Sequence, residues 1–359
     1  VNAGTIEQAR DLFAAADMLY QDRPEARMNL AWAHMRLGNN EGAIEAYRGA
    51  LDILYDAPPE GLDETQLESW ARDRRTASLN LAQLLAQAGR PAEAAEVLGD
   101  FLARNPEVDA ATRVQAMTAQ ANFLAQAGEA DAAQALMEEI AGRTDLTSHD
   151  HFQIGIGRFN TGDFAAAAAS FAEAARLNPY SRDALLNLVQ SLYSEALDLE
   201  KTEQTAERDA RLREIHTEIL ESAEQVRSFD PLNRNILSFM LRAHRGQADL
   251  ANRTEAERYR QASQDLFRAY QGQTYEVSDI SLNLQGNDQA AVNGLLTNIS
   301  GQAGSQVQLR FTAVNRAGAG IDSELVTVTL PAVNESVEFR TQLDLSGGDF
   351  AGWKYEVVG

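Results

Sequence analysis

Two patterns of hydrophobic and polar positions divide the chain. From residue 1 to about 271, apolar residues recur at helical spacing among many alanines. After Tyr270 they alternate with polar residues, as in "QVQLRFTAV" and "ELVTVTL", and short segments such as "QGND" and "SGGD" separate these runs. Helical spacing predicts amphipathic helices, and alternation predicts half-buried antiparallel strands. We therefore expect a helical region over 1–271 and a β region over 275–359.

The helical region repeats one motif. This motif is A-x3-F-x2-A, or the same spacing with other apolar residues, and its copies begin at Ala9, Ala43, Ala94, Ala133 and Ala167. The first two copies are 34 residues apart, and so are the last two. This period and pattern resemble the tetratricopeptide repeat (TPR), a pair of antiparallel helices. The resemblance implies a multidomain chain, α then β, in which an α-α superhelical solenoid of about six repeats, the first partial, precedes the β region.

Two inserts interrupt the regular period. The spacing rises to 51 residues between the copies at Ala43 and Ala94, and to 52 after the copy at Ala167. The inserted segments, near 58–74 and 196–212, are charged and rich in helix-forming residues. We expect each insert to form an extended helix.

The glycines of "GRFNTGDFAAAAASFAEAARLNP" need an explanation. A dinucleotide-binding fingerprint is excluded, because Asn160 stands where a third glycine is needed and no strand precedes Gly155. Gly155 is predicted to be small because two helices approach closely there. Gly162 is predicted to end a helix in the left-handed region.

The β region is predicted to form a small antiparallel β-sandwich of six or seven strands. Three of its segments are "VNGLLTNIS", with Gly294 and Asn298, then "FTAVNRAG" and the closing "WKYEVV". They resemble the FxLYD family of bacterial envelope sandwiches, which implies an immunoglobulin-like fold. Phe311 keeps the phenylalanine of that family, while residues 313–315 are Ala-Val-Asn in place of Leu-Tyr-Asp.

Charge and composition exclude several partners. The net charge is −22, from 31 basic and 53 acidic residues, and such a surface repels nucleic-acid phosphates and anionic lipid head groups. The absence of cysteine excludes disulfides and thiolate metal sites. No run reaches the roughly 18 apolar residues of a membrane span. We expect neither a nucleic-acid partner nor direct membrane insertion.

Catalytic and metal-binding candidates are sparse. His149 and His151 in "SHDHF" are two residues apart, so on a helix they point to different sides and cannot chelate one ion. Ser148 is the expected N-cap of that helix. The sequence has no calcium-loop spacing, nucleophile elbow, zinc-protease motif or phosphate loop. We expect a chain that is not an enzyme and holds no metal or cofactor.

The repeat register predicts a binding surface on the concave face, formed by fixed positions in the first helix of each repeat. These positions are held by Asn29, Trp32, Asn80, Gln83, Asn122, Phe152, Phe159, Asn187, Gln190, Tyr193 and Arg242. In peptide-binding members of the family an asparagine there hydrogen-bonds the ligand backbone, since an amide both donates and accepts. Asparagine is also common there in repeats with no ligand, so both explanations stay open. Arg242 is the one clear cation, which implies an extended peptide or protein surface as ligand and not an acidic C-terminal tail.

Two functions of different classes follow. The first is a non-catalytic protein-interaction scaffold. We expect it outside the cytoplasm of a bacterium (periplasmic, cell-surface or secreted), because the chain opens with Val1, lacks cysteine and carries an envelope-type β region. The second is a structural subunit that assembles with its own copies into a homo-oligomer or an extracellular filament.

The second function rests on the first helix. The register leaves the helix with Leu12 and Phe13 unpartnered on its upstream side, so an apolar stripe is predicted to be uncovered. Three explanations are open: upstream residues were removed, "VNAGT" folds back, or another chain covers the stripe. We favour contact with a second copy through Leu12 and Phe13, with the free strand edges of the sandwich as a second contact.

Overall fold

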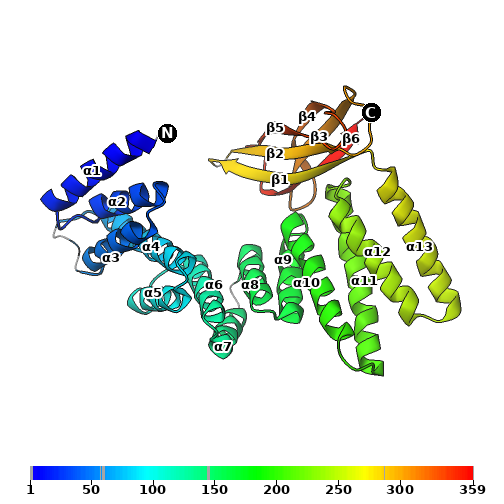
Figure 1. Cartoon of the computed structure of the whole chain (residues 1–359), viewed down its shortest axis with the longest axis horizontal. Helices are drawn as coiled ribbons and strands as arrows, with labels where there is room; N and C mark the ends of the chain where they lie inside the picture. The colour runs from blue at the N-terminus through cyan, green and yellow to red at the C-terminus, as the bar shows by residue number, and fades with distance from the viewer. Residues whose placement is uncertain (1–2, 57, 59–60, 144–145, 287, 359) are drawn as a thin grey trace. The chain divides into compact units, whose positions relative to one another are not determined.

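The computed structural model describes residues 3–56, 58, 61–143, 146–286 and 288–358. In these residues a TPR-like array of thirteen helices is followed by six antiparallel strands in two small sheets (Figure 1). The chain divides into two compact units. The first unit comprises residues 1–146 and 156–162, and the second comprises residues 147–155 and 163–359.

The first unit contains seven complete helices among its described residues. They are α1 (Ala3–Leu19), α2 (Pro24–Arg36), α3 (Asn40–Tyr55), α4 (Glu64–Gln87), α5 (Pro91–Arg104), α6 (Ala110–Gln126) and α7 (Ala130–Ala141). Each helix packs against the next along the chain. Ala43, Tyr47, Ala94 and Leu98, which hold motif positions, are all buried. The repeated motif therefore marks the residues that fill the space between helices.

Helix ends in this unit follow local sequence signals. The Asp63 side chain accepts a hydrogen bond from the Gln66 backbone N–H, and the Gln66 side chain accepts one from the Asp63 N–H, which forms a capping box at the start of α4. Gly38, Gly89 and Gly162 follow helices with φ of 71°, 75° and 82°. Glycine reaches this left-handed region without a Cβ clash, and the prediction for Gly162 is confirmed.

The remaining helices lie wholly or partly in the second unit. They are α8 (Ser148–Asn160), of which residues 148–155 belong to this unit, α9 (Phe164–Leu177), α10 (Arg182–Glu200), α11 (Ala206–Phe229), α12 (Arg234–Leu250) and α13 (Arg253–Gly272). From α9 to α13, each helix packs against the next.

Two helices are longer than the rest. Both α4 and α11 have 24 residues. Helix α4 includes much of the first insert, of which residues 59 and 60 lie outside the described part. The second insert covers the end of α10 and the start of α11. Among the described helices, none combines the length and apolar character that crossing a bilayer requires.

Gly155 lies against the Phe171 ring. A Cβ atom at Gly155 would approach this ring to 2.6 Å, which is closer than packed atoms allow. Phe171 is fully buried and also meets Phe152 edge to face, with ring centroids 5.6 Å apart. The predicted close approach of two helices at Gly155 is confirmed.

The N-cap of α8 is Thr147, and the prediction of Ser148 is wrong. The Asp150 N–H donates to Thr147 Oγ1 at 3.2 Å, and the Thr147 N–H donates to Asp150 Oδ2 at 2.8 Å. This reciprocal pair requires an acceptor three residues after the cap, and only Thr147 has an acidic residue at that spacing. The Ser148 hydroxyl instead donates to the Ala174 carbonyl at 2.8 Å.

The β region forms two facing sheets. Its strands are β1 (Tyr275–Gln285), β2 (Gln289–Asn298), β3 (Gln306–Asn315), β4 (Gly320–Thr329), β5 (Ser336–Asp344) and β6 (Phe350–Val358), in the orders β1-β2-β5 and β4-β3-β6. Phe311 of β3 packs on Phe339 of β5 and on Tyr355 of β6, with ring centroids 5.5 and 5.3 Å apart. These aromatic side chains come from both sheets, so the core lies between the sheets.

Gly294 and Asn298, two residues that carry the family resemblance, have structural roles. A Cβ atom at Gly294 would lie 2.5 Å from the Phe339 ring, so the position must stay small. Asn298 is fully buried, and its side-chain amide donates to the carbonyls of Gly301 and Pro331 at 3.0 and 2.8 Å. Asn298 therefore ties two loops of the sandwich together.

A buried polar cluster joins the helices of the second unit to the sandwich. We call Arg182, Asp230, Asn233 and Tyr355 the Asp230 cluster, in which the Asn233 amide donates to Asp230 Oδ2 at 2.9 Å. Arg182 donates to Asp230 Oδ2 through Nε and Nη2, at 2.9 and 2.7 Å, and the Tyr355 hydroxyl donates to Asp230 Oδ1 at 2.8 Å. Burial and then the neighbouring Asp230 charge raise the pKa of Tyr355 well above its ordinary value, so its hydroxyl stays a donor at neutral pH.

Candidate functional site

The predicted concave-face residues fall into both units. The first unit holds Asn29, Trp32, Asn80, Gln83, Asn122 and Phe159, and the second holds Phe152, Asn187, Gln190, Tyr193 and Arg242. Each group is a candidate surface by itself.

In the first unit, some predicted amides are engaged within the fold. The Asn80 side chain donates to the Tyr47 hydroxyl at 3.0 Å, and Gln83 is exposed. Asn122 Oδ1 is buried without a hydrogen-bond partner among the described residues. Asn29 and Trp32 lie exposed on α2, and Phe159 is half-buried. Asn80 therefore has a structural role in addition to any contact with a ligand.

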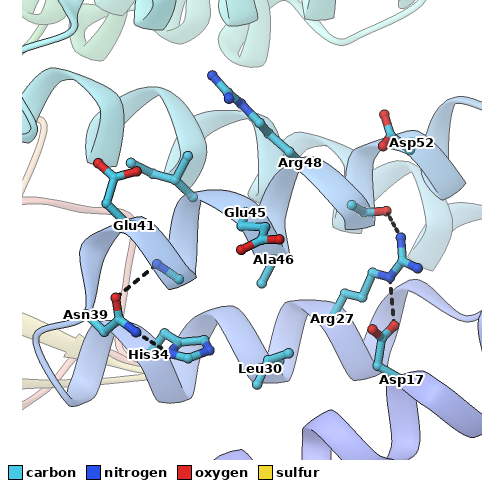
Figure 2. Close-up of a pocket in the computed structure, with 13 residues that line it drawn as sticks. Asp17, Arg27, Leu30, His34, Asn39, Glu41, Glu45, Ala46, Arg48 and Asp52 are labelled. Atoms are coloured by element: carbon cyan, nitrogen blue, oxygen red, sulfur yellow. Dashed lines mark hydrogen bonds and ion pairs between the residues drawn. The ribbon is translucent and has the colours of Figure 1, made fainter.

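A groove of about 870 Å³ lies in the first unit on the other side of α2. Its lining includes Leu30 and His34 of α2. Figure 2 shows Arg27 at one end, where its guanidinium donates to Asp17 Oδ1 at 2.6 Å and to the Gly49 carbonyl at 2.7 Å. Burial, and then the positive charge of Arg10, lower the pKa of His34. This groove contains none of the predicted residues.

Repeat spacing gave no signal for this first groove, because its lining comes mainly from α1, α2 and α3 and includes neither Leu12 nor Phe13. Its lining is largely polar: Arg27 pairs with Asp17, and the His34 ring shares a hydrogen bond with the Asn39 amide.

A second groove, of about 380 Å³, brings predicted residues of the second unit together. We call it the α10–α12 groove. Asn187 and Gln190 line it from α10, Phe239 lines it from α12, and residues 276–279 line it from β1. Phe239 and β1 were not predicted, because repeat spacing alone does not show which neighbouring helix or strand faces α10.

Tyr193 and Arg242 lie one helical turn further along the same two helices. The Tyr193 ring meets Phe239 edge to face, with centroids 5.2 Å apart. The Arg242 guanidinium lies over the Tyr193 ring, 5.0 Å from its centroid, and donates to the Tyr193 hydroxyl. Four of the five predicted residues in this unit therefore belong to one continuous surface.

The fifth, Phe152, lines a separate cavity of about 550 Å³ with Arg316 and Phe350. Half-buried against Phe171, it serves mainly to pack α8 on α9.

The chemistry of the α10–α12 groove is that of amides and paired charges. Asn187 donates to the Asp183 carbonyl of its own helix at 2.8 Å. Gln190 makes no side-chain hydrogen bond within the described part of the chain. The two arginines in the lining are held by carboxylates: Arg182 by Asp230 at 2.7 Å, and Arg234 by Glu276 at 3.6 Å. Such a lining can exchange hydrogen bonds with a polar backbone.

No metal centre is formed by the described residues, in which no three His, Cys, Asp or Glu side chains converge. His149 is exposed.

The two residues predicted for self-association differ in exposure: Leu12 is 71% exposed, and Phe13 is half-buried. Met18 and Leu19 on the same helix are 71% and 76% exposed.

Comparison with protein families supports the repeats. Residues 1–59 and 152–201 match the family model described as tetratricopeptide repeat, so these two segments are similar to tetratricopeptide repeats. A comparison with curated proteins found no significant match.

Several solved structures are similar to this chain. The C-terminal part of a TPR repeat-containing protein from Cytophaga hutchinsonii is 12% identical, with a TM-score of 0.47, over 73% of this chain and 90% of that one. A tetratricopeptide repeat protein from Parabacteroides merdae is 14% identical, with a TM-score of 0.39, over 75% and 93%. YrrB, described as a TPR protein with an unusual peptide-binding site, is 15% identical, with a TM-score of 0.34, over 60% and 98%. These likenesses are too loose to carry a partner over to this chain.

Proposed function

We propose that this chain is a non-catalytic protein-interaction scaffold whose α10–α12 groove binds an extended peptide or a partner surface. The observation that carries the proposal is the grouping of Asn187, Gln190 and Phe239 in one groove, with Tyr193 and Arg242 beside it. Amides recognise a peptide backbone through paired donors and acceptors, and aromatic side chains supply contact area at low entropic cost.

The amide side chains of Asn187 and Gln190 give a direct test. Peptides are first selected on the full chain from a displayed library of random 12-residue sequences. Asn187→Ala combined with Gln190→Ala is expected to weaken binding of the selected peptides about tenfold, because two polar partners of the ligand are lost. Fluorescence anisotropy with labelled peptide measures the change.

Gln261→Ala on α13 is the matched control. Gln261 is exposed and bonds only to Asp265 of its own helix, so its loss should leave the affinity unchanged. Equal affinities for the double variant and the wild type would contradict the groove assignment. A library that yields no peptide would contradict the scaffold itself.

We propose self-assembly as a second candidate, because α1 exposes Leu12, Met18 and Leu19 on a single helix. Large exposed apolar residues that cluster on one element are typical of interfaces. A head-to-tail contact would propagate into a filament, and a two-fold contact would stop at a dimer. The free strand edges of the sandwich could add a second contact.

Leu12→Glu combined with Phe13→Glu is expected to reduce the assembled mass to that of one chain, because two charges would enter the apolar contact. Light scattering at increasing concentration measures the mass, and circular dichroism checks that helix content is kept. Leu67→Glu on α4, at a position that is 45% exposed, is the control. One mass for the wild type and both variants, with single particles in electron micrographs, would rule out assembly through α1.

We also propose that the protein works in a bacterial envelope, outside the cytoplasm. The support is the resemblance of the β region to FxLYD sandwiches, in which Gly294 and Asn298 hold structural positions. Fractionation of the source cells, followed by detection with an antibody, tests the location. Recovery only from the cytosolic fraction would contradict it.

A further inference from the structure

Strand β1 is an edge strand that borders the α10–α12 groove. Within the described residues it pairs only with β2, and its sheet has the order β1-β2-β5. Residues 276–279 of β1 line the groove. An edge strand presents a row of backbone N–H and C=O groups on its unpaired side, so this wall of the groove carries main-chain donors and acceptors.

A bulge limits the usable edge to a short segment. The pairing register of β1 with β2 shifts between Ser278 and Ser281, and Asp279 has a φ of 51°. A bulge of this kind bends the strand and interrupts its ladder. Residues 275–278 therefore form a short regular edge at the groove, too short to recruit a second sheet but long enough for one peptide strand.

The opposite wall offers amide side chains. Asn187 and Gln190 come from α10, and Asn235 comes from the first turn of α12. An extended peptide carries its backbone polar groups alternately on its two sides. A peptide in this groove would thus meet strand groups on one side and amide groups on the other.

We propose that the α10–α12 groove binds its ligand as an added β-strand, paired with residues 275–278 of β1. This inference rests on the proposed scaffold function and specifies how that same groove recognises its ligand. The sandwich is then part of the binding site, and the repeats alone form only half of it.

The charges of the groove select a basic ligand. Arg182 is paired with Asp230, and Arg234 with Glu276. Asp279 is left without an ion pair among the described residues. The chain as a whole carries a net charge of −22, which attracts cationic partners and repels anionic ones. The ligand is therefore an extended peptide segment of net positive charge.

Hydrogen exchange with residue resolution tests the strand pairing. On the full chain with a peptide selected from the random library, alternate backbone amides of residues 275–278 are expected to exchange at least tenfold more slowly. N-methylation of a peptide amide that donates to β1 should weaken binding up to about tenfold. N-methylation of a neighbouring amide, which points away from β1, should change binding little. Asp279→Asn should weaken binding of the selected basic peptides and reduce its salt dependence.

Three results would overturn the inference. Unchanged exchange in β1, with a peptide that still depends on Asn187 and Gln190, would reject strand pairing and leave the scaffold function standing. Selected peptides without net positive charge, whose affinity is the same for Asp279→Asn, would reject the charge selection. A library that yields no peptide would reject both this inference and the scaffold function.

Discussion

Asp230→Ala should lower the free energy of unfolding by about 3–5 kcal/mol, the usual cost of removing one partner from a buried ion pair. The Asp230 side chain is fully buried, and Arg182 is 14% exposed. Without Asp230, Nε and Nη2 of Arg182 and the hydroxyl of Tyr355 would lose the acceptor that they share. Urea denaturation, monitored by tryptophan fluorescence, measures the loss. Trp353 reports on this site, because its ring centroid lies 5.4 Å from the Arg182 guanidinium.

Asp183→Ala is a matched control, because Asp183 is the other carboxylate that bonds to Arg182. Its side chain is 72% exposed and lies 3.3 Å from Arg182 Nη1. An exposed pair contributes under about 1 kcal/mol, so this variant should unfold almost like the wild type. Similar losses for both variants would show that the Asp230 cluster does not hold the sandwich on the helices.

Phe171→Ala is expected to lower the free energy of unfolding by about 3–5 kcal/mol, because it empties a fully buried aromatic site. The site cannot easily collapse, since the facing residue is Gly155, whose missing side chain made room for the ring. Thermal unfolding followed by circular dichroism at 222 nm, together with urea denaturation, measures the change.

Phe152→Ala provides the comparison for Phe171. Phe152 touches the Phe171 ring but is only half-buried. Its truncation should therefore lower the free energy of unfolding by only about 1 kcal/mol. An equal or larger loss for Phe152 would mean that the contact between α8 and α9 depends on the ring of Phe152, which lines the separate cavity, and not on Phe171 at the motif position.

The candidate site was predictable only in part. Asn187, Gln190, Tyr193 and Arg242, which the repeat register predicted, lie together in the structure, because first helices of neighbouring repeats present the same positions to the same side. It could not show that Asn80 bonds to Tyr47, since that depends on how two particular helices pack. It also did not identify the groove beside Arg27 and His34.

The sequence by itself determined the local elements of this protein. A 34-residue period fixed the helix pairs, glycines at 38, 89 and 162 ended helices because they reach the left-handed region, and alternation after Tyr270 produced strands. These signals are short-range, so each can be recognised within a few tens of residues.

Tertiary structure alone decided how the sandwich and the repeats of the second unit combine. Asp230 and Tyr355 are 125 residues apart in sequence and 2.8 Å apart in space, and no periodic pattern links them. Residues 276–279 of β1 line one groove with residues of α10 and α12 for the same reason. Which buried donor meets which acceptor follows from the packing of whole elements, because an unpaired polar group in the interior is costly and only the assembled fold supplies its partner.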